Sequence, residues 1–106
     1  MAQVSLLSAN PRTLCLLWEE HESGVGGRKA AKLFSREERG KVKHEYHRRK
    51  FVWECIGTLV LRAGFTAQVA IDRIYQVYGE NTNISRIINR MKQDRQAGIV
   101  HPSLQV

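Results

Sequence analysis

The sequence is poor in the residues that stabilise secreted and membrane-embedded proteins. Only two of its 106 residues are cysteines, and only two are prolines. Two thiols cannot build a disulfide-rich framework, and we expect both to be reduced and buried. No apolar run approaches the roughly 20 residues that a membrane-spanning helix needs. The first residues also lack the basic start and long apolar stretch of a secretory signal. The sequence therefore predicts an intracellular domain without a membrane partner.

The sequence also lacks any arrangement typical of a metal centre or a catalytic site. Cys15, Cys55, His44 and His47 combine only at spacings that fit no zinc motif. The two histidines lie close together on an expected helix, but no nucleophile or acid–base partner accompanies them. The glycines of residues 24–27 follow no strand and lack the spacing of a phosphate-binding loop. We therefore predict no enzymatic activity, no metal site and no cofactor.

Alternation of polar and apolar residues, which marks a half-buried strand, does not extend over any stretch of six residues. Capping residues, helical spacing of apolar residues and glycines instead divide the chain into helices. The content of hydrophobic residues, 42%, suffices for one modest core. We predict a single all-α domain over residues 1–106 with about five helices. The expected elements are helices at 10–22, 36–63, 67–78 and 84–97, and a short helix or turn at 28–34.

Basic residues are concentrated in one segment, whereas the rest of the chain is electrically balanced. Residues 28–50 hold ten of the seventeen Lys and Arg residues and only three acidic residues, so they carry the whole net charge of +7. Cations crowded in this way repel one another. A surface that collects them attracts polyanions, of which double-stranded DNA is the first candidate.

The segment 36–63 has the pattern of one long basic helix that opens with a capping box at Ser35 and Glu38. Steps of 100° per residue place a basic stripe within an arc of about 80° and along a length of about 21 Å. Tyr46 lies at the border between this stripe and the apolar seam. The DNA contacts predicted from this arrangement and from the preceding segment are Arg28, Lys29, Arg36, Arg39, Lys43, Tyr46, His47 and Lys50.

A second polar face lies on the expected helix 84–97, opposite its isoleucines. It carries Arg86, Asn89 and Gln93, whose side chains are of the types that read base edges. Together with the helix at 67–78, this helix is loosely similar to a helix-turn-helix motif with a long turn. These three residues are candidate base contacts, and a plain solvated surface is the alternative.

Several residues bear a likeness to a known family. Leu14, Trp18, Glu20, the glycine-rich loop 24–27 and the run Tyr46-His47-Arg48-Arg49-Lys50 resemble the DNA-binding domain of fungal transcriptional activators of glycolytic genes. Similar domains occur in crypton-type mobile elements. The resemblance implies a nuclear, sequence-specific and transcription-related DNA-binding domain. It also implies DNA contacts at Tyr46, Arg48, Arg49 and Lys50.

Two points stay open at the level of sequence. The helical wheel places Arg49 on the apolar seam, where it could bridge to Glu45 instead of holding a phosphate. The basic helix could also dock on an acidic protein, and the seam from Trp53 to Val60 has a heptad-like spacing that could support homo-oligomerisation. DNA binding is the leading prediction, and a protein-interaction module is the alternative.

Overall fold

Polar side chains at helix starts set several boundaries in this computed structural model, which describes residues 6–8, 11–80 and 82–104. Each capping side chain accepts a hydrogen bond from the backbone N–H three residues later, and so satisfies a free donor of the first turn. Gly64 and Gly98, both with a left-handed φ of 70°, end two of the helices. The capped helices are α1 (Leu14–Glu22) after Thr13, α2 (Arg36–Lys41) after Ser35, α4 (Ala67–Tyr78) after Thr66 and α5 (Ile84–Ala97) after Asn83.

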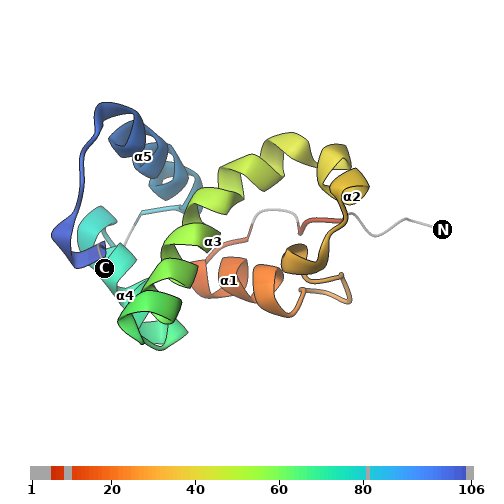
Figure 1. The fold of residues 1–106 in the computed structure, drawn as a ribbon, viewed down its shortest axis with the longest axis horizontal. Coiled ribbons are helices and arrows are strands. Elements are labelled where there is room, and N and C mark those ends of the chain that lie inside the picture. The colour runs from red at the N-terminus through yellow and green to blue at the C-terminus, as the bar shows by residue number, and fades with distance from the viewer. Residues whose placement is uncertain (1–5, 9–10, 81, 105–106) are drawn as a thin grey trace.

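The longest helix, α3 (Lys43–Ala63), runs through the middle of the domain, and the other helices pack around it (Figure 1). All four of them contact α3. The short 3₁₀ turn η1 (Ala31–Leu33) packs on α1, and a second turn, η2 (Pro102–Leu104), packs on α4. No residue in the described ranges forms a β-strand. The prediction of an all-α domain with about five helices is confirmed.

The core lies where the apolar face of α3 meets α1, α4 and α5. Val52, Ile56 and Leu59 of α3 are fully buried. The indole N–H of Trp53 donates to the backbone carbonyl of Leu17, 2.8 Å away, so this large side chain is buried with its polar group satisfied. Trp53 and Ile56 of the seam considered for homo-oligomerisation are therefore buried inside the domain, and Val60 is partly buried.

Four of the expected elements match or fall within their predicted ranges. α4 and α5 span the same residues as the helices expected at 67–78 and 84–97. The first helix starts later than expected, because Thr13 provides the cap, and Asn10, the cap expected from the sequence, lies outside the described residues. The segment 28–34 contains only the single turn η1.

The long basic helix expected over 36–63 is instead two helices. α2 ends at Lys41, and Val42 has φ −122° and ψ 29°, which lie outside the helical region. Gly40 and β-branched Val42 are both poor helix formers, and the Val42 side chain packs against the core. α2 does not continue the axis of α3 (Figure 1). The continuous stripe from Arg36 to Lys50 was therefore a wrong prediction, and its cations lie on two separate helices.

Candidate nucleic-acid interface

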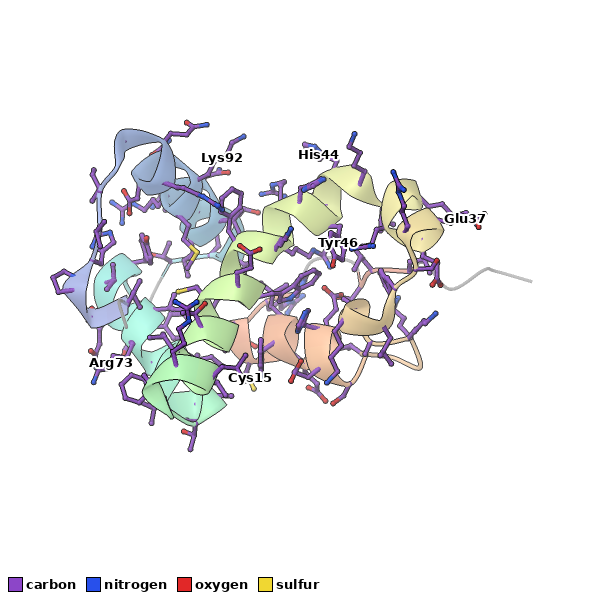
Figure 2. The ribbon with its side chains drawn as sticks, viewed as in Figure 1. Cys15, Glu37, His44, Tyr46, Arg73 and Lys92 are labelled. Carbon is purple, nitrogen blue, oxygen red and sulfur yellow. The ribbon has the colours of Figure 1, made fainter. Side chains whose placement is uncertain are left out.

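α5 packs beside α3, and the two helices leave a groove of about 570 Å³ between them. Both walls carry basic side chains, and the residues come from segments far apart in the sequence. His44 of α3 and Lys92 of α5 project from the same edge of the molecule (Figure 2). The groove is lined by His44, His47, Arg48, Lys50, Phe51 and Glu54 of α3 and by Ile88, Asn89, Lys92 and Arg95 of α5.

The positive charges of this groove are weakly compensated. Glu54 is the one acidic side chain among the described residues that line it. Its carboxylate lies 3.6 Å from Nζ of Lys50 and 3.9 Å from Nη1 of Arg95, and all three side chains are largely in water. Long, exposed ion pairs of this kind contribute little to stability and exchange readily with other charged partners. The groove can therefore offer its cations to a polyanion.

A second groove continues from the first on the other side of Arg48 and Ile88, which line both. It has a volume of about 730 Å³ and adds Arg12 from the segment before α1 and Ser85 from the first turn of α5. Arg12 and Ser85 are exposed. The two grooves are therefore neighbours on the surface that α3, α5 and the N-terminal segment form.

Arg48, Arg49 and Lys50 are neighbours in sequence but have three different environments. Lys50 is exposed and faces the groove. Arg48 is partly exposed and donates through Nη1 to Glu45, 2.9 Å away. Burial of Glu45 opposes its charged form, but the hydrogen bond and positive charge of Arg48, with the charge of Arg49, leave the pKa of Glu45 below its usual value.

Arg49 is part of the protein interior, with 5% of its surface exposed. Its Nη1 donates to both carboxylate oxygens of Glu20 at 2.7 and 2.9 Å, and its Nη2 donates to the carbonyl of Ser8 at 2.8 Å. Its Nε donates to Glu45 at 3.3 Å, which is the bridge that the helical wheel allowed. The DNA contact implied for Arg49 by the resemblance is incompatible with this burial. Arg49 instead holds α1 and the N-terminal segment against α3.

Glu20 is the buried partner of this ion pair, with 1% of its surface exposed. In addition to Arg49, it accepts hydrogen bonds from the hydroxyl of Ser8 and from the backbone N–H of Ser8 at 2.7 Å. A carboxylate without water needs this full set of donors to remain charged. We call Ser8, Glu20 and Arg49 the buried clamp. The pairing of Glu20 with Arg49 was not predicted from the sequence.

The remaining predicted cations lie before α2, on α2 and at the first residue of α3. Arg36, Arg39 and Lys43 are exposed, and within the part of the chain that the structure describes none of them forms an ion pair. Lys29, by contrast, lies 2.8 Å from Glu38. This hydrogen bond, followed by one from the backbone N–H of Ser35, lowers the pKa of Glu38 to about 2. Arg36 and Arg39 of α2 and Lys43 of α3 are thus free to meet an anion, whereas Lys29 is already partnered.

Arg28 and Tyr46 are held by contacts within the protein. Nη1 of Arg28 donates to the carbonyl of Val25 at 3.0 Å. The ring of Tyr46 packs edge-on against Trp53, with ring centroids 5.3 Å apart, and is partly buried. Tyr46 therefore occupies the border position that the helical wheel predicted. His47, like His44, is exposed at the groove.

The three candidate base contacts are all exposed on α5, but they do not all lie at the groove. Asn89 lines the groove, whereas Arg86 and Gln93 do not. Lys92 and Arg95 also line the groove, and neither was predicted, because the charge pattern along the chain does not connect them to the basic segment. The spacing of three residues from Asn89 to Lys92 and again to Arg95, which puts all three near one helix face, was the available signal.

The two cysteines differ in a way that the sequence did not predict. Cys15 on α1 is exposed, so the expectation of two buried thiols was wrong. Cys55 lines a separate cavity of about 410 Å³ near the C-terminal tail, and burial raises its pKa to about 11. In the same cavity Asp94 accepts a hydrogen bond from the hydroxyl of Tyr78 at 2.9 Å and lies 2.7 Å from Nε2 of His101. These contacts fasten the tail to α4 and α5.

The described residues contain no cluster of three or more His, Cys, Asp or Glu side chains that could hold a metal ion. None of the helices within those residues is both long and apolar enough to cross a bilayer. Comparisons with protein-family models, with curated proteins and with solved structures gave no match to this chain. A function must therefore be inferred from the surface itself.

Proposed function

We propose that this chain is a DNA-binding domain that grips the backbone of double-stranded DNA with cations from α2, α3 and α5. The observation that supports the proposal most directly is the α3–α5 groove. Its walls bring Arg48 and Lys50 together with Lys92 and Arg95, although more than forty residues of sequence separate Lys50 from Lys92. Cations gathered from two helices onto one surface suit a polyanion with many phosphates along its backbone.

The exposure and weak pairing of most of these side chains favour binding of an external polyanion over a role in stabilising the fold. Lys50, Lys92 and Arg95 are solvated or only loosely paired, so little must be broken before they meet a phosphate. Arg48, by contrast, must first leave its 2.9 Å contact with Glu45. The α2 cations extend the basic surface beyond the groove. Arg49 is excluded from the set of contacts, since its donors are used inside the protein. The proposed phosphate contacts are Arg36, Arg39, Lys43, Arg48, Lys50, Lys92 and Arg95.

The proposal extends to a sequence-specific, transcription-related role in the nucleus, which the resemblance to fungal activator domains supports. Phosphate contacts fix the register of a protein on DNA, but specificity requires side chains that reach base edges. Arg86, Asn89 and Gln93 are the candidates for that task. Selection from a pool of randomised duplexes tests it directly, since a specific domain enriches a short consensus and an electrostatic anchor enriches none.

The salt dependence of binding tests the electrostatic part of the proposal. If about five phosphates are neutralised, the logarithm of affinity should fall against the logarithm of salt concentration with a slope of roughly −4 to −5. Fluorescence anisotropy with a labelled duplex measures this slope. A flat response to salt contradicts the proposal.

Replacement of Arg36, Arg39, Lys43 and Lys50 together by Gln should weaken binding to all duplex sequences and leave the helical circular dichroism unchanged. Arg62→Gln is the matched control, because Arg62 is an exposed cation in the last turn of α3, outside the residues that line either groove. Competition with polyglutamate addresses the alternative of an acidic protein partner. If polyglutamate displaces the protein from DNA at equal charge concentration, the protein-interaction function is favoured.

A further inference from the structure

The α3–α5 groove contains more than a phosphate site requires. Phosphate contacts need only donors and positive charge. This groove also has an apolar floor, formed by the half-buried ring of Phe51 and by buried Ile88. Its walls carry the amide of Asn89 and the carboxylate of Glu54, both of which can accept hydrogen bonds. A planar apolar ring with polar edges, attached to a phosphate, would use all of these features at once.

The dimensions of the groove favour a single nucleotide unit. Its volume of about 570 Å³ lies within the range of roughly 300–1,000 Å³ that small-molecule pockets occupy. A base pair inside a duplex cannot enter such a space, because its faces are covered by the neighbouring pairs and its edges by the backbones. An unpaired base with its own sugar and phosphate is small enough to enter.

We propose that the α3–α5 groove binds one unpaired nucleotide of a DNA strand. The base packs on Phe51, its polar edge meets Asn89 and Glu54, and its phosphates meet Lys50 and Lys92. This inference rests on the proposed DNA-binding function and adds a preferred form of DNA to it. Aromatic side chains beside a cationic track are the usual means by which proteins hold unpaired bases.

Two side chains in the groove are suited to change partners when a base arrives. The guanidinium of Arg95 lies 5.6 Å from the centroid of the Phe51 ring, and 71% of its side chain is exposed. It can therefore move aside and cover the outer face of a base that stacks on Phe51. Glu54 is held only by its two long ion pairs and can turn to a base amino group. Because cytosine has such a group and thymine lacks one, the groove should favour cytosine over thymine.

Three labelled DNAs test the proposal with the full chain in anisotropy titrations at one salt concentration. The first is a paired duplex, the second is the same duplex with one additional unpaired cytosine, and the third carries an unpaired thymine instead. Stacking of one base on an aromatic side chain should tighten binding of the cytosine-bulged duplex about 5- to 150-fold relative to the paired duplex. The thymine-bulged duplex should show a smaller gain. Free cytidine monophosphate should compete only weakly, because it lacks the flanking phosphates.

Two variants locate the binding site. Phe51→Leu keeps an apolar floor but removes the aromatic face, and it should abolish most of the preference for the bulge. Phe65→Leu is its matched control, because Phe65 is also half-buried and carries an arginine over its ring, with Cζ of Arg73 4.7 Å from the centroid. Phe65 lines neither groove, so its variant should keep the preference. Asn89→Ala, at an exposed position, tests the same site should Phe51→Leu reduce helicity in circular dichroism.

The outcomes separate this inference from the proposed function. Equal affinity for the paired and bulged duplexes, with a steep salt dependence for both, overturns the groove proposal and leaves duplex binding in place. A preference that persists in Phe51→Leu and Asn89→Ala overturns it as well, because the unpaired base would then bind elsewhere. Absence of salt-dependent binding to all three DNAs overturns both proposals. A preference that these two variants remove supports the inference.

Discussion

α3 meets α1 and α5 through charged residues in opposite ways. On the α1 side the buried clamp joins Arg49 to Glu20, with 5% and 1% of their surfaces exposed and the closest oxygen 2.7 Å from Nη1. On the α5 side Lys50 and Arg95 share Glu54 at 3.6 and 3.9 Å, and their side chains are 47% and 71% exposed. α3 thus takes part in a buried ion pair on its α1 side and in solvent-exposed ion pairs on its α5 side.

The contrast teaches that a run of basic residues is not one functional unit. In the interior a charge must be matched completely, so the buried clamp fixes where α1 lies on α3. At the surface the same chemical groups contribute little to folding and are available for binding. The direction in which each side chain points from α3 decides its role, and adjacent positions such as Arg49 and Lys50 fall on different sides.

The largest effect should follow from breaking the buried clamp. Arg49→Met leaves the carboxylate of Glu20 buried without its charged partner, and it should lower the free energy of unfolding by about 3–5 kcal/mol. Urea denaturation followed by circular dichroism measures this loss. Arg48→Met is the matched control, since that neighbouring side chain is partly exposed, and it should cost less than about 1 kcal/mol.

A second substitution sharpens this result. The double variant Glu20→Leu with Arg49→Met removes both buried charges and should recover most of the stability lost in the single variant. Equal losses in the Arg49→Met and Arg48→Met variants would contradict the distinction between the two sides of α3.

A smaller effect, on binding and not on folding, should follow from neutralising the groove. Lys50→Gln combined with Lys92→Gln should change the free energy of unfolding by no more than about 0.5 kcal/mol, because both side chains are exposed. Loss of two phosphate contacts should reduce duplex affinity by roughly 30-fold at 0.15 M salt and the magnitude of the salt slope by about 2. A thermal melt and an anisotropy titration separate the two quantities. If the double variant is destabilised but keeps its affinity for duplex DNA, Lys50 and Lys92 contribute to folding and not to DNA binding.

The smallest effect should come from the exposed pair of Lys29 and Glu38. The pKa of Glu38 falls from 4.5 to about 2 on folding, because its charged form accepts hydrogen bonds from Lys29 and Ser35. A depressed pKa stabilises the folded state above the unfolded pKa, and this contribution is lost as the pH falls from about 4.5 towards 2. Glu38→Gln should therefore lower the melting temperature slightly at pH 6, and the difference from the original protein should disappear near pH 2. A difference independent of pH would show that the charge of Glu38 is not the cause.

The sequence was most informative where local rules act alone. Thr66 and Asn83 are side-chain caps, and Gly98 adopts the left-handed conformation that ends α5, so the bounds of α4 and α5 follow from short-range chemistry. The break at Val42 was not predicted. The capping box at Ser35 starts a helix, and the polar run after it contains no clear stop signal before residue 63. Gly40 and Val42 weaken that helix, but only the packing of Val42 on the core decides that the chain turns there.

The candidate site was less predictable, because its composition depends on which helices become neighbours. Lys92 and Arg95 belong to an electrically balanced part of the sequence and join the basic segment only when α5 packs on α3. Arg49 and Glu20 lie 29 residues apart, and no local pattern couples them. The apolar position of Arg49 on the helical wheel was a usable indication that this arginine points inward.

The unequal cysteines give the molecule a built-in attachment point. Thiol reagents attack the thiolate, so a pKa of about 11 leaves Cys55 almost unreactive at neutral pH. A maleimide dye or a surface linker should therefore couple to Cys15 alone. Cys15 projects from the edge of the molecule opposite His44 and Lys92 (Figure 2), so the native chain can be immobilised for single-molecule work with its cationic side facing the solution.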